Sequence, residues 1–279
     1  MSTARPSNQP RVLITGGGGL LGQALCRMAP ADVHCEVTVR TTPGPEGVKQ
    51  HRVDLAQPLA AFELIERRRP SLVIHTAYST QDLGRDVVDA ASEVAAACAT
   101  CEVDLIHVST DAVFDGEHAP YAETDPPAPI HPYGRAKALA EAAVRIAHPS
   151  AAIIRTSLLI NLDPPDNTSR WVLDALRSGE RPMLFSDELR SPLFVDDLAT
   201  AIWKLSALNS GQRCGVWHLG GARPMSRVDI GVWLCEQFGL DASLIRRAKS
   251  ADLPEPRPRD LRLSCERALQ CGIEIAGIG

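Results

Sequence analysis

The chain has 279 residues, of which 44% are hydrophobic and 23% charged, as expected for an ordinary soluble protein with a sizeable core. Its formal net charge of −5 gives no general attraction to nucleic acid or to an anionic membrane surface, so neither is expected as a partner. The sequence has no run of about 18 apolar residues, which argues against a membrane-spanning helix.

The first ten residues, MSTARPSNQP, are polar and lack the apolar core of a signal peptide, so residues 1–10 are predicted to be a flexible leader. The eight cysteines are scattered and most lie in apolar contexts, which indicates reduced thiols of a cytoplasmic protein. Cys98 and Cys101 form a C-x-x-C inside a predicted helix. Because no second such pair and no suitably spaced histidine pair is present, zinc binding is disfavoured and no metal site is predicted.

Short apolar strands alternate with helical patterns in the first part of the chain. Apolar strands that alternate with helices imply βαβ units around a parallel sheet buried on both faces. We therefore predict a doubly wound, Rossmann-type α/β domain over residues 11–157, with ligands at the carboxyl ends of its strands. Its strands are expected at 11–17, 34–40, 51–55, 71–77, 103–110 and 151–157, and its helices at 20–29, 59–69, 86–101 and 133–147.

The alternation weakens beyond about residue 158. We interpret residues 158–279 as a small α/β substrate-binding lobe, partly interleaved with the Rossmann core. Helices are expected within 165–180, 195–208, 226–239 and 265–272, short strands at 182–185 and 216–219, and a Pro-rich loop or extended arm at 253–264.

The stretch ITGGGGLLG places Gly16, Gly19 and Gly22 in a G-x-x-G-x-x-G spacing between a predicted strand and a predicted helix. One glycine turns the chain, another lets the backbone approach a pyrophosphate, and the third lets helix and strand pack closely. The helix begins near Leu20 and Leu21, and its unpaired N–H groups attract phosphate. A flexible turn is the alternative, but the strand–turn–helix context favours a dinucleotide site.

The end of the second strand indicates which dinucleotide is bound. NAD-binding proteins tend to place a carboxylate there for the ribose 2′-OH, whereas an arginine accommodates the 2′-phosphate of NADP. Here the strand ends at Arg40, and Glu36 lies too early in it to serve. A guanidinium is planar and presents paired donors, so it suits a phosphate, although a solvated charge is its alternative role. NADP(H) is therefore favoured over NAD(H).

A threonine, a tyrosine and a lysine form the predicted catalytic set. Thr110 ends a predicted strand, and Tyr133 and Lys137 lie four residues apart on the next helix, so they share a face. A phenol with a pKa of about 10 is a poor acid at neutral pH, and a nearby ammonium lowers that pKa. Thr110 would bind a carbonyl oxygen that Tyr133 protonates, and Lys137 would also anchor the nicotinamide ribose. A chance helix-surface pair is the alternative, but the order of the motifs favours catalysis.

The sequence resembles the extended short-chain dehydrogenases/reductases, specifically the dTDP-4-dehydrorhamnose reductase branch, in VLITGGGGLLGQAL, VSTDAVFDG, HPYGRAKALAE, IIRTSLLI, SPLFVDDLATAI and GVWHLGG. The resemblance implies catalytic roles for Thr110, Tyr133 and Lys137. It implies reduction of the 4-keto group of a nucleotide-linked deoxysugar, usually with NADPH, and a homodimer is a common state of such enzymes. The resemblance also implies contacts with the adenine for Asp54 and Leu55, and places Thr76, Ala77 and Tyr78 along the cofactor cleft. Substrate contacts are expected from Thr110, Asp111, Ala112, Thr156 and Trp171.

Three residues depart from the pattern of that branch. Ala112 replaces a usual tyrosine after the S-T-D triplet, His75 replaces an asparagine, and Val87 lies near the position of another asparagine. The related dehydratases carry a glutamate where Ala112 lies, so dehydration is disfavoured. A non-catalytic alternative remains, because the same branch includes an NADP-binding regulatory subunit of methionine adenosyltransferase. Arg257 and Arg259 are candidates for a nucleotide diphosphate or for a solvated arm.

Overall fold

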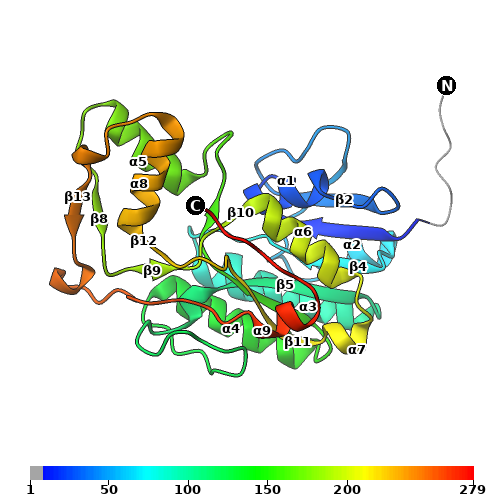
Figure 1. Ribbon diagram of the computed structural model, residues 1–279. Coiled ribbons are helices and arrows are strands. Elements are labelled where there is room, and N and C mark those ends of the chain that lie inside the picture. Colours follow the sequence, from blue (N-terminus) through cyan, green and yellow to red (C-terminus); the bar gives the residue numbers. More distant parts are fainter. Residues whose placement is uncertain (1–8) are drawn as a thin grey trace. The chain divides into compact units, whose positions relative to one another are not determined.

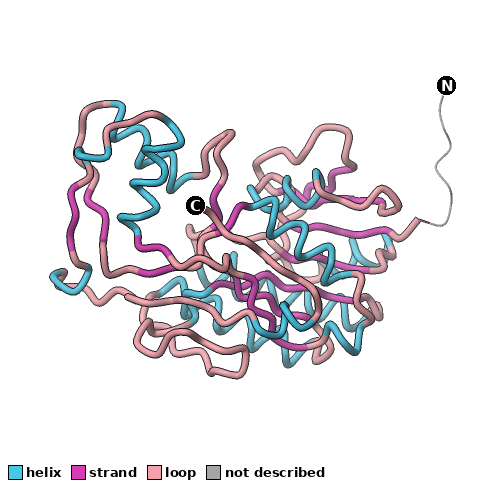
Figure 2. Tube along the Cα trace, in the orientation of Figure 1, coloured by secondary structure: helices cyan, strands magenta, loops and turns pink. Residues whose placement is uncertain are grey.

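The computed structural model describes residues 9–279 (Figures 1 and 2), so the predicted leader over residues 1–10 falls almost entirely outside the described part. The chain divides into two compact units, which are described separately. The first comprises the chain up to Val108 with 139–153 and 202–215, and the second comprises 109–138, 154–201 and 216–279. Within the described residues, no helix is both long enough and apolar enough to cross a membrane.

A seven-stranded sheet in the order β11-β6-β5-β4-β1-β2-β3 confirms the predicted doubly wound fold. Strand β1 pairs in parallel with β2 and β4, so that Ile14 lies between Val37 and Ile74, and all three are fully buried. Strand β11, expected among the elements beyond residue 158, is the seventh strand of this sheet. The strands are β1 (Arg11–Thr15), β2 (His34–Val39), β3 (Lys49–Arg52), β4 (Leu72–His75), β5 (Asp104–Thr110), β6 (Ala152–Thr156) and β11 (Gly215–Leu219).

Helices α1, α2, α3 and α4 follow strands of the sheet in the expected alternation, and Figure 2 colours helices cyan and strands magenta. The helix expected at 86–101 begins with a π-helical turn, η1 (Gly84–Asp89), which continues into α3 (Ala90–Thr100). The remaining helices are α1 (Leu20–Arg27), α2 (Ala60–Arg68), α4 (Pro132–Ala147), α6 (Val195–Ser206) and α7 (Ser210–Arg213), and a short 3₁₀ turn, η2 (Asp111–Val113), follows β5.

The second unit has its own apolar core between α5 (Asn167–Arg177) and α8 (Arg227–Phe238), where Leu173, Leu184 and Leu234 are buried together. Both helices begin at strong N-caps: Asp166 accepts hydrogen bonds from two backbone N–H groups of α5, and a capping box starts α8. Figure 1 shows β8 and β13 running beside each other along this core. The other elements are β7 (Leu159–Ile160), β8 (Met183–Phe185), β9 (Leu189–Arg190), β10 (Leu193–Phe194), β12 (Met225–Ser226), β13 (Arg246–Ala248), η3 (Ala242–Leu244), η4 (Ser250–Asp252) and α9 (Glu266–Gln270).

A buried histidine lies in β11 within the second unit. The Nδ1 atom of His218 is 3.0 Å from the carbonyl oxygen of Ser264 and 3.1 Å from that of Tyr121. The edge of its ring meets Phe114, with 5.8 Å between the ring centroids. Burial, together with the nearby Arg155 guanidinium, lowers the pKa of His218 to about 4. The folded unit therefore holds this imidazole in its neutral form.

We expect this histidine to make the protein less stable in mild acid. The unfolded histidine has a pKa of about 6.5, so the unfolded chain binds more protons as the pH falls from there towards 4. The free energy of unfolding should fall by about 1 kcal/mol from His218 alone between about pH 7.5 and about pH 5.5. Urea denaturation of wild type and His218→Gln at both pH values measures this, with the exposed His118→Gln as control. An equal pH dependence in wild type and His218→Gln would contradict the expectation.

Candidate active site

The first unit contains a cavity of about 670 Å³ at the carboxyl ends of β1, β2, β3 and β4. Ligands of doubly wound sheets bind at this edge. The cavity brings together eight of the residues predicted to contact the cofactor: Gly16, Gly19, Arg40, Asp54, Leu55, Thr76, Ala77 and Tyr78. It also includes polar residues that the sequence analysis did not select, among them Thr38, Ser79, Gln81, Asp82, Arg85 and Asp86.

The glycine turn forms one wall of this cavity. Gly16 has a φ of +71°, and a Cβ there would lie 2.8 Å from Cα of Ala77. A Cβ on Gly22 would lie 2.3 Å from the carbonyl oxygen of Gly16, so α1 packs directly against the turn. Both glycines are required by backbone contacts, in the roles that their spacing predicted. Leu20 and Leu21 lie in the first turn of α1 with Gly22 and do not line the cavity.

Thr15, the last residue of β1, forms hydrogen bonds with the segment that follows β4. Its hydroxyl oxygen accepts from the backbone N–H groups of Thr76 at 3.0 Å and Ala77 at 3.1 Å. The Thr76 hydroxyl donates in return to the Thr15 carbonyl oxygen at 2.6 Å. His75 Nδ1 lies 2.8 Å from the Thr15 hydroxyl, and its buried ring stacks on His107. These bonds hold the cavity wall at Thr76 and Ala77 against the glycine turn.

Four charged residues form a chain of ion pairs across the opposite wall. Arg40 donates to both oxygens of Asp86, at 2.6 Å and 3.0 Å, and Arg85 donates to Asp86 at 2.7 Å and also to Asp54. The hydrogen bonds from Arg40 lower the pKa of Asp86, so its carboxylate is ionised at neutral pH. Nothing in a single sequence marked Arg85 and Asp86, because their contacts with Arg40 and Asp54 join residues more than 30 positions apart.

Glu36 takes no part in this cavity. Its side chain is fully buried within the first unit, where it accepts hydrogen bonds from Arg68 at 2.8 Å and from His51 at 2.7 Å. Burial opposes ionisation, but these hydrogen bonds prevail and lower the pKa of Glu36 to about 2. Its carboxylate is therefore used to hold β2, β3 and α2 together.

The predicted catalytic residues lie around the start of α4 in the second unit. The Thr110 hydroxyl accepts from the Ala112 backbone N–H at 3.2 Å and lies 3.3 Å from Asp111, to which it donates. Tyr133 and Lys137 are one helical turn apart on α4. Tyr133 is partly exposed, whereas Lys137 is only 4% exposed. A buried ammonium exerts a stronger field on its neighbours than a solvated one.

A model of the RmlD substrate binding domain matches residues 10–276, nearly the whole chain. The chain belongs to this family. It is 34% identical over 267 residues to the probable low-salt glycan biosynthesis reductase Agl14 of Haloferax volcanii, with 90% of this chain and 88% of that protein covered. It is also 32% identical over 264 residues to the dTDP-4-dehydrorhamnose reductase of Mycobacterium tuberculosis, with 89% and 82% covered. The predicted resemblance to reductases of the dTDP-4-dehydrorhamnose type is thereby confirmed.

Other relatives of this RmlD-family chain differ in their described roles. The methionine adenosyltransferase 2 subunit beta of Pongo abelii is 29% identical over 286 residues, with 96% of this chain and 83% of that protein covered. Among solved structures, the dTDP-4-dehydrorhamnose reductase of Bacillus anthracis in complex with NADP has a TM-score of 0.81 at 21% identity, with 97% and 96% covered. MoeE5 in complex with UDP-glucuronic acid and NAD has a TM-score of 0.80 at 21% identity, with 95% and 93% covered. These two likenesses concern the fold.

The substrate residues expected from the RmlD-family resemblance are in different environments. Thr156 is buried and its hydroxyl donates to the Leu219 carbonyl oxygen at 2.8 Å, so it holds β11 beside β6. Trp171 is 54% exposed on α5, whereas the other three tryptophans are buried. Its indole is therefore accessible from solvent and is not part of the core.

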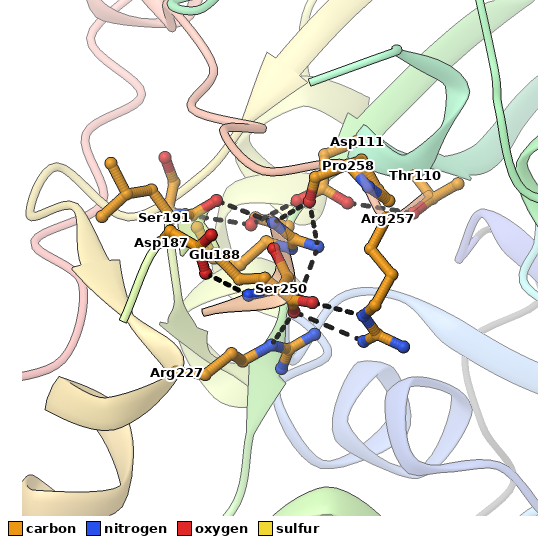
Figure 3. Close-up of polar contacts among 12 residues, drawn as sticks. Thr110, Asp111, Asp187, Glu188, Ser191, Arg227, Ser250, Arg257 and Pro258 are labelled. Carbon is orange, nitrogen blue, oxygen red and sulfur yellow. Dashed lines mark hydrogen bonds and ion pairs between the residues drawn. The ribbon is translucent and has the colours of Figure 1, made fainter. Parts of the chain in front are cut away.

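The second unit also buries a network of charges, shown in Figure 3. Ser157 donates to Asp111 at 2.6 Å, and burial raises the pKa of the Asp111 carboxyl. Deeper in the network, Glu188 is fully buried and accepts hydrogen bonds from Arg227 at 3.4 Å and from Arg257. Arg257 is therefore engaged within the protein. Arg259, by contrast, pairs with Glu117 where both side chains are about half exposed.

The cysteines and acidic residues give no sign of a metal centre within residues 9–279, where no three His, Cys, Asp or Glu side chains are arranged to hold an ion. Cys98 is buried, and burial raises the pKa of its thiol. None of the eight cysteines, all of which lie in the described residues, is in a disulfide.

Gly134 couples the loop after Thr110 to the start of α4, and its replacement should destabilise the protein. A Cβ on Gly134 would lie 1.9 Å from the Ala112 carbonyl oxygen, so Gly134→Ala forces backbone to move. We expect a loss of about 2 kcal/mol in the free energy of unfolding, measured by urea denaturation. The control is Gly211→Ala in α7, where the nearest atom is 3.5 Å away and alanine should be neutral or mildly stabilising. Equal stabilities of the two variants would contradict this packing argument.

Proposed function

We propose that the chain is an NADP(H)-dependent reductase that acts on the 4-keto group of a nucleotide-linked deoxysugar or on a related ketone. One observation carries the proposal: the same chain has a cavity at its glycine turn and, on α4, Tyr133 one helical turn from the buried Lys137. The cavity fits a dinucleotide, because side chains are excluded where its pyrophosphate would approach Gly16 and the start of α1. NADPH bound there would supply the hydride.

The side chains of the second unit have the chemistry that a ketone reduction needs. The Tyr133 phenol would donate its proton to the developing alkoxide, and the Lys137 ammonium would stabilise the phenolate that remains. The Thr110 hydroxyl can turn from Asp111, a contact of 3.3 Å, and donate to the substrate oxygen. The neutral hydroxyl and the charged ammonium would then stabilise negative charge from two residues of different elements, β5 and α4.

The substrate class is supported by relatives and by the exposed Trp171. Two relatives at 32–34% identity are named as reductases, one of them for dTDP-4-dehydrorhamnose. An exposed indole on α5 suits stacking against a nucleotide base or a sugar ring. Ala112 is small where the branch usually has tyrosine, which would leave space beside the S-T-D triplet or remove a contact with the sugar. We infer NADP(H) rather than NAD(H) from Arg40, which lines the cavity at the end of β2.

A second candidate function follows from a different relative. The likeness to methionine adenosyltransferase 2 subunit beta covers 96% of this chain. A regulatory subunit of that kind would bind NADP(H) and a partner enzyme without turning over a ketone. The presence of Thr110, Tyr133 and Lys137 together favours catalysis, because a purely regulatory protein does not require an acid and its electrostatic partner.

The test is NADPH oxidation with a dTDP-4-keto-6-deoxyhexose. We expect Tyr133→Phe to lower kcat by about 10²-fold or more, since the variant lacks the acid, while NADPH binding measured by fluorescence is retained. Lys137→Met should shift the pH optimum to higher pH. Without the ammonium the phenolate of Tyr133 is less favoured, so the pKa of the phenol rises. Lys204→Met, at an exposed position on α6, is the matched control and should behave as wild type.

Full activity of Tyr133→Phe would rule out its role as the acid. NADPH binding without turnover of any ketone, together with a co-purifying methionine adenosyltransferase, would favour the regulatory function instead.

A further inference from the structure

Two arginines converge on one carboxylate at the wall of the dinucleotide cavity. Arg40, at the end of β2, and Arg85, on η1, both donate to Oδ1 of Asp86, at 2.6 Å and 2.7 Å. Arg40 also donates to Oδ2 at 3.0 Å. Two guanidinium groups that share one acceptor atom must lie close together. Without Asp86 their like charges would drive them apart.

The exposures of the three side chains show which of them can meet a ligand. The side chain of Asp86 is 5% exposed, whereas those of Arg40 and Arg85 are 37% and 34% exposed. The Asp86 carboxylate is therefore largely covered, whereas both guanidinium-bearing side chains remain about one third exposed, and all three residues line the cavity. The contacts within the described residues use two of the five N–H donors of each arginine, which leaves donors for a further anion.

Two other carboxylates border this group. Asp54 accepts from Arg85, and Asp82 accepts from the backbone N–H of Arg85 at 3.0 Å. Asp54 lies at the end of β3, where adenine contact is implied by the family resemblance. An adenine amino group that donates to Asp54 would compete with Arg85 for this carboxylate. Arg85 would then have one more donor for an anion on the adenosine ribose.

We propose that Arg85 and Arg40 together bind the 2′-phosphate of NADP(H), with Asp86 as the positioning residue that holds the two guanidinium groups side by side. The inference rests on the proposed use of NADP(H) and assigns its specificity to a pair of arginines instead of Arg40 alone. Two planar donors suit a phosphate dianion, which presents three acceptor oxygens. A ribose 2′-OH offers one neutral group, so it gains little from the second arginine.

The test uses 2′,5′-ADP and 5′-AMP, which differ only in the 2′-phosphate, in binding titrations by calorimetry. We expect wild type to bind 2′,5′-ADP more tightly. Arg85→Gln should weaken 2′,5′-ADP binding by about tenfold or more and change 5′-AMP binding by less than about twofold, because a charge-assisted hydrogen bond is lost only with the phosphate. Arg67→Gln, an exposed arginine on α2 outside the cavity, is the matched control and should leave both affinities unchanged.

Asp86→Asn tests the positioning role. The amide keeps the size of the side chain but loses the charge that holds the guanidinium groups together. We expect the ratio of the two affinities to fall by about threefold or more, with 5′-AMP binding retained. A purely structural role would weaken both ligands alike. A rise in the ratio would show that Asp86 competes with the phosphate, and would overturn its positioning role.

The outcomes separate this inference from the proposed function. If Arg85→Gln keeps the preference for 2′,5′-ADP and Arg40→Gln loses it, Arg40 acts alone and the inference is wrong, while the proposed use of NADP(H) stands. If Arg85→Gln weakens both ligands equally, Arg85 serves the adenosine site in general and the inference is also wrong. If wild type shows no preference for 2′,5′-ADP, both the inference and the proposed use of NADP(H) fail.

Discussion

The close approach of backbone segments at the glycine turn is the constraint on which the cavity of the first unit depends. A side chain on Gly16 would collide with the loop after β4, and one on Gly22 would collide with the turn itself. The ends of β1 and β4 meet there because Gly16 lacks a Cβ, and Thr15 then joins them by hydrogen bonds to Thr76 and Ala77, while Gly22 lets α1 pack against the turn. Thr76 and Ala77, which this contact holds in place, line the cavity together with Gly16.

A similar constraint orders the second unit. Gly134 allows the first turn of α4 to lie against the carbonyl oxygen of Ala112, two residues after Thr110. The loop that follows β5 and the helix that carries Tyr133 and Lys137 are therefore fixed to each other by backbone contact. The proposed role of Tyr133 as an acid would need this rigidity, because small displacements of an acid from its substrate cost much of the rate. Gly134, which lies between Tyr133 and Lys137, therefore helps to fix both residues relative to the loop after β5.

Carboxylates of the first unit show how surroundings assign different tasks to the same chemical group. Glu36 is enclosed by Arg68 and His51 and serves to join two strands and a helix. Asp86 is also buried, but it lines the cavity together with its arginine partners, which are about one third exposed. Burying the Asp86 carboxylate costs desolvation energy, which its hydrogen bonds to Arg40 and Arg85 offset. Glu36 therefore has a structural role, whereas the arginine partners of Asp86 border the cavity, where a recognition role is proposed for them.

The sequence by itself determined the doubly wound fold and the turn glycines, and it singled out Thr110, Tyr133 and Lys137 as the proposed catalytic set. These features are local: apolar periodicity marks strands and helices, and the glycine and Y-x-x-x-K spacings lie within a few residues. Only the tertiary structure decided the partners of Arg40, the place of β11 in the main sheet and the exposure of Trp171. Each of these depends on contacts between positions far apart in the chain, and no spacing in one sequence reports such contacts. The pairing of Arg40 with Asp86 joins residues 46 positions apart, because the fold brings the residue after β2 and the first turn of η1 to the same cavity.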